Sequence, residues 1–152
     1  MSLHNIQKSK IVNVKFGKNV KIIDPVNLYD CFIEDDVFIG PFVEIQSNVR
    51  IKSKTRIQSH SFICDGVTIN SNCFIAHGVM FTNDNFKNGG PSGRENLKKT
   101  VIGSFVSIGS NTTILPVKIC DRVVIGAGSV VTKDILKSGF YAGNPIKFLR
   151  KI

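Results

Sequence analysis

The stretch IEDDVFIGPFVEIQSNVRIKSKTRIQSHSFICDGVTINSNCFIAHGVMF, residues 33–81, repeats a large apolar residue at every sixth position. The repeated residues are Ile33, Ile39, Ile45, Ile51, Ile57, Ile63, Ile69, Ile75 and Phe81. Four residues after each of the first eight comes a small or β-branched residue: Val37, Val43, Val49, Thr55, Ser61, Val67, Cys73 and Val79. A period of six fits neither the 3.6-residue turn of a helix nor an antiparallel meander with irregular turns.

Apolar positions of neighbouring hexapeptides, such as Val37 and Ile39, lie two residues apart, so both side chains point to the same side of a short strand. Three hexapeptides form one triangular turn of about 18 residues, and successive turns stack about 4.8 Å apart through parallel hydrogen bonds. The spacing recurs outside the quoted stretch at Phe16, Ile22 and Leu28, at Ile102, Ile108 and Ile114, and at Ile119, Ile125 and Val131. We predict one all-β domain over residues 1–152, a parallel β-helix solenoid of hexapeptide repeats.

The composition supports this fold class. The chain has 20 Ile and 16 Val but only 6 Leu and 3 Ala, and β-branched residues favour strands over helices. An apolar fraction of 42% with 20% charged residues is typical of a soluble domain with a core. No apolar run approaches the roughly 20 residues of a membrane span, and the N-terminal residues lack the apolar stretch of a signal peptide. We expect a cytoplasmic protein without a membrane partner.

The net charge of +9 predicts an anionic partner. Nucleic acid is not expected, because the aromatic residues follow the six-residue repeat and do not outline a basic groove. The four cysteines show no CxxC spacing, which favours reduced and mostly buried thiols at Cys31, Cys64, Cys73 and Cys120.

The periodicity breaks for long only at TNDNFKNGGPSGRENLKKT, residues 82–100, which is polar and rich in Gly, Asn and Lys. A loop of this length inside a compact solenoid is uncommon and more often functional than not. The repeat stops after Lys133, and the tail over residues 133–152 is expected to cover the end of the solenoid. Within it, we predict an extended piece at SGFYAGNP (138–145) and a short amphipathic helix from Ile146 to Ile152.

The repeat resembles that of the hexapeptide-repeat acyltransferases. The resemblance implies a left-handed parallel β-helix, which reverses the usual right-handed crossover between parallel strands. It also implies acetyl-CoA as co-substrate, no metal ion, and a homotrimer with active sites between neighbouring subunits.

Within that family, HGVMFTND (residues 77–84) followed by a long loop resembles the bacterial nucleotide-sugar N-acetyltransferases. Those enzymes acetylate amino groups of dTDP- or UDP-linked deoxyaminohexoses for cell-surface polysaccharides. The resemblance implies that His77 is a general base and that Asn83 orients the sugar, since an imidazole accepts protons near neutral pH. Asp84 stands where the galactoside-type O-acetyltransferases carry a catalytic His, so we place it in the catalytic group and expect an amine as acceptor.

The acceptor is expected to contact His60, Arg56 and the loop residue Arg94. His60 precedes His77 by 17 residues, which places both at the same corner of adjacent turns. Arg56 ends a basic run without acidic residues: Arg50, Lys52, Lys54 and Arg56. This run is a candidate contact for a pyrophosphate, and a solvated basic face explains it equally well.

The segments IGSFVSIGSNTTILP (102–116), VVIGAGSVVTKD (123–134) and AGNPIKFLR (142–150) resemble the acetyl-CoA site of the superfamily. The cofactor-binding residues that this implies are Ser110 and Ala127 along the pantetheine arm, Thr132 and Lys133 beside the CoA, and Lys147 and Arg150 at the nucleotide phosphates. Small residues let a linear arm lie close to the coil wall, and Lys and Arg form charge-assisted bonds to phosphate.

Other functions fit parts of the pattern. An O-acetyltransferase acting on a sugar or another hydroxyl is the first alternative. A non-catalytic hexapeptide-repeat scaffold is the second, although it leaves the long loop and the basic tail unexplained. A γ-type carbonic anhydrase holds zinc with three histidines, whereas here His4 precedes the repeat and only His60 and His77 lie within it.

Overall fold

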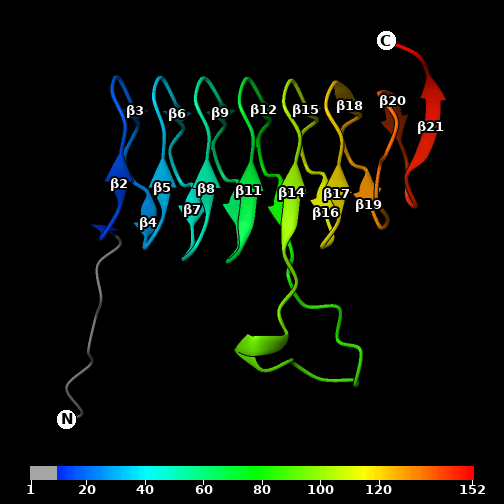
Figure 1. Cartoon of the computed structure of the whole chain (residues 1–152), viewed down its shortest axis with the longest axis horizontal. Helices are drawn as coiled ribbons and strands as arrows, with labels where there is room; N and C mark the ends of the chain where they lie inside the picture. The colour runs from blue at the N-terminus through cyan, green and yellow to red at the C-terminus, as the bar shows by residue number, and fades with distance from the viewer. Residues whose placement is uncertain (1–9) are drawn as a thin grey trace.

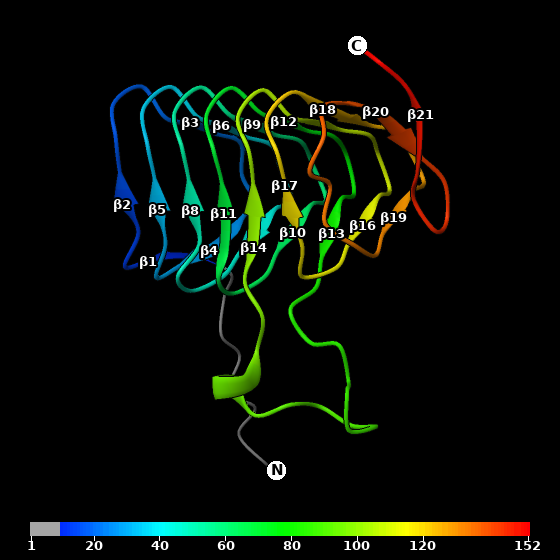
Figure 2. The ribbon, with the colours of Figure 1, turned by 45° about the vertical axis from the view of Figure 1, so that its right-hand side comes forward.

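A computed structural model describes residues 10–152, so His4 lies outside the described residues. The chain winds as a triangular prism whose three faces are parallel sheets (Figures 1 and 2). In Figure 1 the strands of the near face run upward while the chain advances from left to right, and the chain then crosses over the top to the far face. This sense of winding is left-handed, as the resemblance implied.

The strands are short, and each pairs with the strand one turn earlier and the strand one turn later. The first sheet contains β1 (Ile11–Val12), β4 (Asn27–Tyr29), β7 (Glu44–Ile45), β10 (Phe62–Ile63), β13 (Met80–Phe81), β16 (Thr113–Ile114) and β19 (Val130–Val131). The second sheet contains β2 (Lys15–Phe16), β5 (Phe32–Ile33), β8 (Arg50–Ile51), β11 (Val67–Ile69), β14 (Thr100–Ile102) and β17 (Lys118–Ile119). The third sheet contains β3 (Lys21–Ile22), β6 (Phe38–Ile39), β9 (Arg56–Ile57), β12 (Phe74–Ile75), β15 (Ser107–Ile108), β18 (Val123–Ile125), β20 (Gly139–Ala142) and β21 (Lys147–Arg150).

The register of the sheets stacks the repeated apolar residues on one another. Ile33 pairs with Ile51, and Ile45 pairs with Ile63. Every first-position residue from Ile33 to Phe81 is at most 1% exposed, and the small second-position residues are buried beside them. The prediction from the six-residue period is therefore confirmed. Phe16, at 43% exposure, and the half-buried Ile22 are exceptions, because they lie in the first turn of the prism within residues 10–152.

The corners also follow the six-residue period. From Asp30 to Gly78, every sixth residue has a positive φ, between 50° and 81°. This conformation turns the chain sharply, and it is disfavoured for residues with a Cβ other than Asn and Asp. The sequence nevertheless places aromatic side chains at two of these corners, Phe42 and His60, and at a later corner, Phe105.

The positive-φ corners line up along three edges of the prism. The His77 edge, between the third and first sheets, has Phe42, His60, Gly78, Asn111 and Gly128 at these positions. The loop edge, between the first and second sheets, has Asn13, Asp30, Asn48 and Gly66. The third edge, between the second and third sheets, has Asn19, Asp36, Lys54, Asn72, Phe105 and Arg122.

The long loop leaves β13 and returns to β14, and it projects away from the prism in both views (Figures 1 and 2). Its neck is closed by a hydrogen bond of 2.8 Å from the Lys98 N–H to the Asn83 carbonyl. It contains one turn of 3-10 helix, Arg94–Asn96.

The helix predicted from Ile146 to Ile152 is wrong. The chain there forms β21, which pairs antiparallel with β20, while the extended piece predicted before it is present as β20. The last parallel strand would otherwise leave its outer N–H and C=O groups unpaired, and the returning tail satisfies them. Phe148 packs edge-on against Tyr141 with ring centroids 5.3 Å apart.

The cysteines form no disulfide. Cys31, Cys64 and Cys73 are buried and Cys120 is half-buried, as predicted. Burial raises the pKa of Cys31 and Cys73 to about 11 and that of Cys64 to about 12, so these thiols are poor nucleophiles near neutral pH. No helix within residues 10–152 is long and apolar enough to cross a membrane.

Candidate active site

His77 lies on an edge of the prism together with two of the predicted donor residues. It occupies the corner after β12, and Ser110 and Ala127 occupy the equivalent corner position in the next two turns. The backbone links the three corners directly, because Asn111 N–H donates to the His77 carbonyl at 2.9 Å and Gly128 N–H donates to the Ser110 carbonyl at 2.8 Å. The structure therefore brings the predicted base and the predicted pantetheine positions into one column.

The His77 side chain is exposed and is held by one hydrogen bond. Its Nδ1 lies 2.9 Å from the Oγ of Ser59, one turn earlier on the same edge. When Nδ1 carries the proton and donates it to Ser59, Nε2 keeps a free lone pair that can accept a proton. The sequence reasoning missed Ser59, although its spacing of 18 residues from His77 is the register of the turns.

Glycines keep the column free of side chains. Gly78 has a φ of 66°, and a Cβ there would lie 2.6 Å from Oδ1 of Asn111. A Cβ at Gly126 would lie 2.9 Å from the Cβ of Ala142, and a Cβ at Gly109 would collide with the backbone N of Ala127. These three glycines are required by the close stacking of adjacent turns, whereas a Cβ at Gly128 would meet nothing within 4 Å, so the edge is open at that corner.

The same edge carries backbone donors without partners. Within residues 10–152, the N–H groups of His77, Ser110 and Ala127 make no backbone or side-chain hydrogen bond, whereas the residue that follows each of them donates to the turn before it. Unpaired N–H groups repeated along one edge suit a ligand that contains carbonyl oxygens.

His60 also lies on the His77 edge, as its spacing predicted. The residue directly beneath His77 in the previous turn is Ser59, however, and His60 is the next residue along the chain. The His60 ring lies against Phe42 from the turn before that. The two ring centroids are 4.8 Å apart and the ring planes are inclined by 32°. Phe42 is a second residue that sequence reasoning did not assign to the site.

Asn83 and Asp84 lie on the loop edge and not beside His77. They follow β13, which crosses the whole width of the first sheet between the two edges. Asn83 Nδ2 donates to the Asp65 carbonyl at 3.4 Å. Within one chain, the three residues predicted to be catalytic are therefore not brought together.

Asp84 braces the base of the loop. Its carboxylate accepts hydrogen bonds from the Ser92 N–H at 2.6 Å, the Ser92 hydroxyl at 2.8 Å and the Phe86 N–H at 2.9 Å. These bonds, that from the Ser92 N–H first, lower the pKa of Asp84 from its usual value. A carboxylate engaged in this way is a weak proton acceptor.

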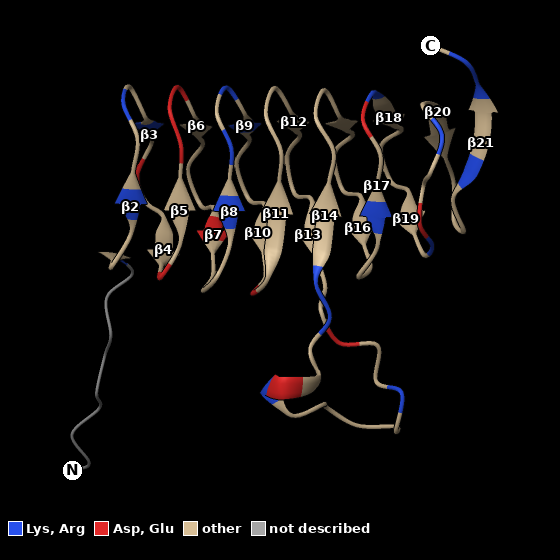
Figure 3. Cartoon of the chain, viewed as in Figure 1, with Lys and Arg blue, Asp and Glu red and all other residues tan. Residues whose placement is uncertain are grey.

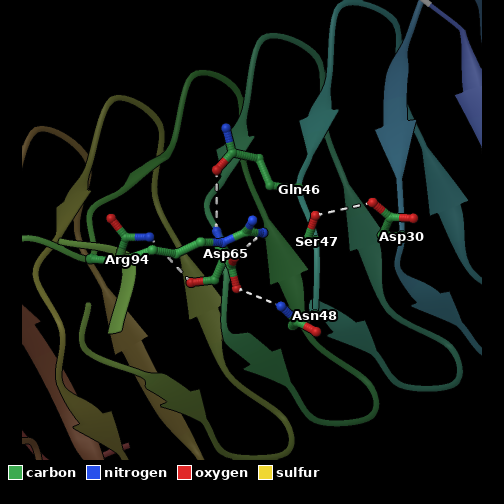
Figure 4. Close-up of polar contacts among 7 residues, drawn as sticks. Asp30, Gln46, Ser47, Asn48, Asp65 and Arg94 are labelled. Carbon is green, nitrogen blue, oxygen red and sulfur yellow. Dashed lines mark hydrogen bonds and ion pairs between the residues drawn. The ribbon is translucent and has the colours of Figure 1, made fainter. Parts of the chain in front are cut away.

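Arg94 clamps the loop onto the loop edge (Figure 4). Its guanidinium lies 3.3 Å from the carboxylate of Asp65, and this is the only ion pair within residues 10–152. Asp65 also accepts from Asn48 Nδ2 at 3.1 Å, and its N–H donates to Gln46 Oε1 at 3.3 Å. Arg94 is thus engaged in holding the loop, away from the His77 edge.

The basic run from Arg50 to Arg56 wraps around the third edge. Arg56 lies over the ring of Phe38, 4.4 Å from its centroid, and Arg50 lies over Phe32 at 5.0 Å. Figure 3 shows that charge alternates along this edge: a basic turn comes first, an acidic turn follows it, and the basic turn with Arg50–Arg56 comes next. The structure places this run on a different edge from His77, so it does not assemble with the column.

Two of the remaining donor residues line a hollow at the C-terminal end of the prism. Lys133 and Lys147 border a cavity of about 490 Å³ together with Lys137, Tyr141 and Phe148. Lys147 pairs with Ala142, which lies against Gly126 at the end of the column.

Thr132 and Arg150 do not line this hollow. Thr132 is exposed just after β19, so it and Lys133 lie on the loop-edge side of the prism, at the positions equivalent to Thr82 and Asn83. Arg150 lies on β21 with its guanidinium 5.0 Å from the ring centroid of Phe140.

Two family models match the chain. The model described as "Bacterial transferase hexapeptide (six repeats)" matches residues 30–65, and "Hexapeptide repeat of succinyl-transferase" matches residues 99–133. Among curated proteins, the bifunctional protein GlmU of Ruthia magnifica subsp. Calyptogena magnifica is 32% identical over 132 residues, covering 81% of this chain and 29% of the relative. The chain spans less than a third of the length of the GlmU relatives that it matches.

Solved structures share the fold. A hexapeptide transferase family protein from Anaplasma phagocytophilum has a TM-score of 0.76 at 19% identity, covering 91% of this chain and 79% of that one. A maltose O-acetyltransferase from Clostridium difficile 630 has a TM-score of 0.62 at 26% identity, covering 90% and 70%. The hexapeptide-repeat acetyltransferase VCA0836 from Vibrio cholerae O1 biovar eltor, complexed with acetyl coenzyme A, has a TM-score of 0.62 at 27% identity, covering 72% and 63%.

The prism, its left-handed winding and its six-residue period define a left-handed parallel β-helix. Both hexapeptide models match separate segments of this fold, so the chain is similar to the hexapeptide-repeat transferases over residues 30–65 and 99–133.

Proposed function

We propose that the protein transfers an acetyl group from acetyl-CoA to an amino group of a nucleotide-linked deoxyaminosugar. The observation that carries this proposal is the column of His77, Ser110 and Ala127 on one glycine-lined edge. One exposed imidazole stands at one end of the column, and Lys147, paired with Ala142 beside Gly126, stands at the other. This order matches a thioester beside His77 and the nucleotide end of CoA near the C-terminus.

The chain's residues fit the donor along this edge. The unpaired N–H groups of Ser110 and Ala127 are suited to the amide carbonyls of a pantetheine arm, and the corner at Gly128, where an added Cβ would meet nothing within 4 Å, leaves room for it. Lys133, Lys147, Thr132 and Arg150 are the residues that would meet the nucleotide and its phosphates. Bound acetyl-CoA supplies an acyl group activated as a thioester. The related Vibrio cholerae acetyltransferase, solved with acetyl coenzyme A, supports this donor.

His77 acts first as the general base and then as the general acid. As the acceptor nitrogen attacks the thioester carbon, Nε2 of His77 takes a proton from that nitrogen, and Ser59 holds the ring through Nδ1. The new C–N bond replaces the C–S bond, and the imidazolium returns the proton to the departing thiolate. The unpaired N–H of His77 is in reach of the same corner and is a candidate donor to the developing oxyanion.

We propose a homotrimer in which a neighbouring copy completes each site. Asn83 and the loop lie on a different edge from His77 of the same chain, so they can orient an acceptor at His77 only from a second copy. Sedimentation equilibrium at micromolar concentration is expected to give three times the chain mass, and a monomer would contradict the shared site.

Hydroxyl acetylation is the second candidate, favoured by the 26% identity to the maltose O-acetyltransferase. A hydroxyl needs a general base more than an amine does, and His77 with Ser59 provides one. The two candidates differ in how strongly the rate depends on His77.

The test is release of CoA thiol from acetyl-CoA with a panel of acceptors: dTDP- and UDP-linked aminosugars, galactosides, maltose and serine. Rapid turnover of one aminosugar nucleotide supports the proposal. Turnover of hydroxyl acceptors alone supports the second candidate. Binding of CoA without any turnover would contradict both acceptor classes while leaving the donor column in place.

A further inference from the structure

Phe42 occupies a position where the fold disfavours it. It is at a positive-φ corner with a φ of 59°, where Gly or Asn carries the least strain, and its ring is 57% exposed. The ring is thus largely outside the core. Local stability gives no reason for a phenylalanine at this corner, and bulky residues kept in such conformations concentrate at functional sites.

The ring lies on the edge that carries the proposed reaction. Phe42 N–H donates to the Pro25 carbonyl at 2.6 Å, and His60 N–H donates to the Pro41 carbonyl at 3.2 Å, so both corners belong to the ladder that continues to His77. Phe42 is two turns, or about 10 Å, from the level of Gly78. It lies on the side of His77 opposite to the donor column.

Together, Phe42 and His60 form a stacked pair of rings in line with the column, because centroids 4.8 Å apart with planes inclined by only 32° place the rings face to face. A ligand whose reacting group reaches His77 and whose body extends away from the donor runs alongside this stacked pair. A flat ring with an apolar face, either a pyranose or a nucleobase, is the chemistry that extends such a stack of exposed rings.

We propose that Phe42, supported by His60, is the ring-stacking subsite for the acceptor. This inference rests on the proposed acyl transfer at His77 and adds the residue that holds the acceptor's ring. Stacking of this kind sets affinity and does not enter the bond-making step, so its loss raises the acceptor KM and leaves kcat unchanged.

The chain contains a matched control. Phe105 is also at a positive-φ corner, with a φ of 58°, and is 53% exposed, but it lies on the third edge. Asn is well tolerated at such corners, so both Phe42→Asn and Phe105→Asn are expected to fold with at least wild-type thermal stability. Phe42→Asn therefore removes a ring from the His77 edge, and Phe105→Asn removes one from the third edge.

With the best acceptor of the panel, Phe42→Asn is expected to raise the acceptor KM about 10- to 100-fold, with kcat and the acetyl-CoA KM unchanged. Phe105→Asn is expected to leave all three constants at wild-type values, and Phe42→Tyr, which keeps the ring, is expected to restore the acceptor KM. An acceptor KM within twofold of wild type in Phe42→Asn overturns the subsite. Dissociation of the oligomer in Phe42→Asn, seen by sedimentation, also overturns it, because the ring would then be a subunit contact.

Two inhibition experiments identify which ring of the acceptor stacks on Phe42. Inhibition by dTDP or UDP alone that weakens in Phe42→Asn supports stacking of the nucleobase, and inhibition by the free aminosugar that weakens supports stacking of the pyranose. If no acceptor turns over, the proposed function fails, and NMR titration of the same nucleotides and sugars still decides the subsite. Saturable shifts at Phe42 and His60 support it, and their absence overturns it.

Discussion

Oγ of Ser59 lies 2.9 Å from Nδ1 of His77, across adjacent turns of the prism. The two residues are 18 positions apart, so their contact depends on the register of stacked turns and not on neighbouring sequence. Ser59 fixes one nitrogen of an exposed imidazole and leaves the other toward solvent.

Ser59→Ala should therefore lower the acyl-transfer rate modestly, about 3- to 10-fold, while His77→Ala removes the base itself and lowers it by about 10²- to 10⁴-fold. Ser71→Ala, at the equivalent corner position on the third edge, is the control. Equal effects of Ser59→Ala and Ser71→Ala would rule out the positioning role.

Thr100 is fully buried, and its hydroxyl has no hydrogen-bond partner. At the equivalent inward position, Thr55 donates to the Asn70 carbonyl at 2.9 Å and accepts from the Cys73 N–H at 3.2 Å. Thr100→Val should raise the free energy of unfolding by about 1 kcal/mol, whereas Thr55→Val should lower it by about 1–3 kcal/mol. Chemical denaturation of the two variants measures both, and destabilisation by Thr100→Val would indicate an unrecognised partner.

Gly78 and Gly128 have nearly the same backbone conformation, with φ of 66° and 68°, but different surroundings. An added Cβ meets Asn111 Oδ1 at Gly78 and nothing within 4 Å at Gly128. Gly128→Ala should lower the free energy of unfolding by about 1 kcal/mol from backbone strain alone, and Gly78→Ala should cost more. Denaturation midpoints compare them. Equal losses would mean that the Asn111 side chain moves aside freely.

The Arg94 side chain is 77% exposed, so its ion pair with Asp65 should add little to global stability. Its effect should be local: Arg94→Ala is expected to speed tryptic cleavage at Lys87 in the loop without shifting the unfolding midpoint. Arg122→Ala, on the third edge, is the matched substitution. A lower midpoint with unchanged cleavage would show that the pair stabilises the prism instead of the loop.

Cys120 should be the only thiol that reacts in the native protein. Burial raises the pKa of all four thiols, but Cys31, Cys64 and Cys73 are also buried from the reagent, whereas Cys120 is half-buried. Titration with a disulfide reagent at pH 8 is expected to label one thiol when native and four when unfolded, and Cys120→Ser should abolish the native reaction. Fast labelling of more than one native thiol would show that the prism opens.

The core was predictable because it follows from a local rule. Each inward residue, such as Ile45 or Ile63, is determined by its place in the hexapeptide, and the same rule gives the shared edge of His60 and His77. Counting one hexapeptide from His77 to Asn83 could also have shown that they lie on different edges. The helix at the tail was wrong because the unpaired edge of β20, far from the tail's own pattern, decides its conformation. The ring contact of Phe42 likewise depends on the three-dimensional register.

The hydrogen bond between Lys98 and Asn83 closes the base of the loop. The loop is therefore a cassette, an insertion that can change without altering the turns it joins. Phe81 pairs with Ile114 and Ile69 pairs with Ile102 in the parallel ladder, so the turns on either side stack as if no residues had been inserted. Loop-closure entropy grows slowly, about 0.6 kcal/mol for each doubling of length. The cassette can therefore be shortened, extended or exchanged between homologues at small thermodynamic cost, and sequence drift there leaves the rigid column untouched.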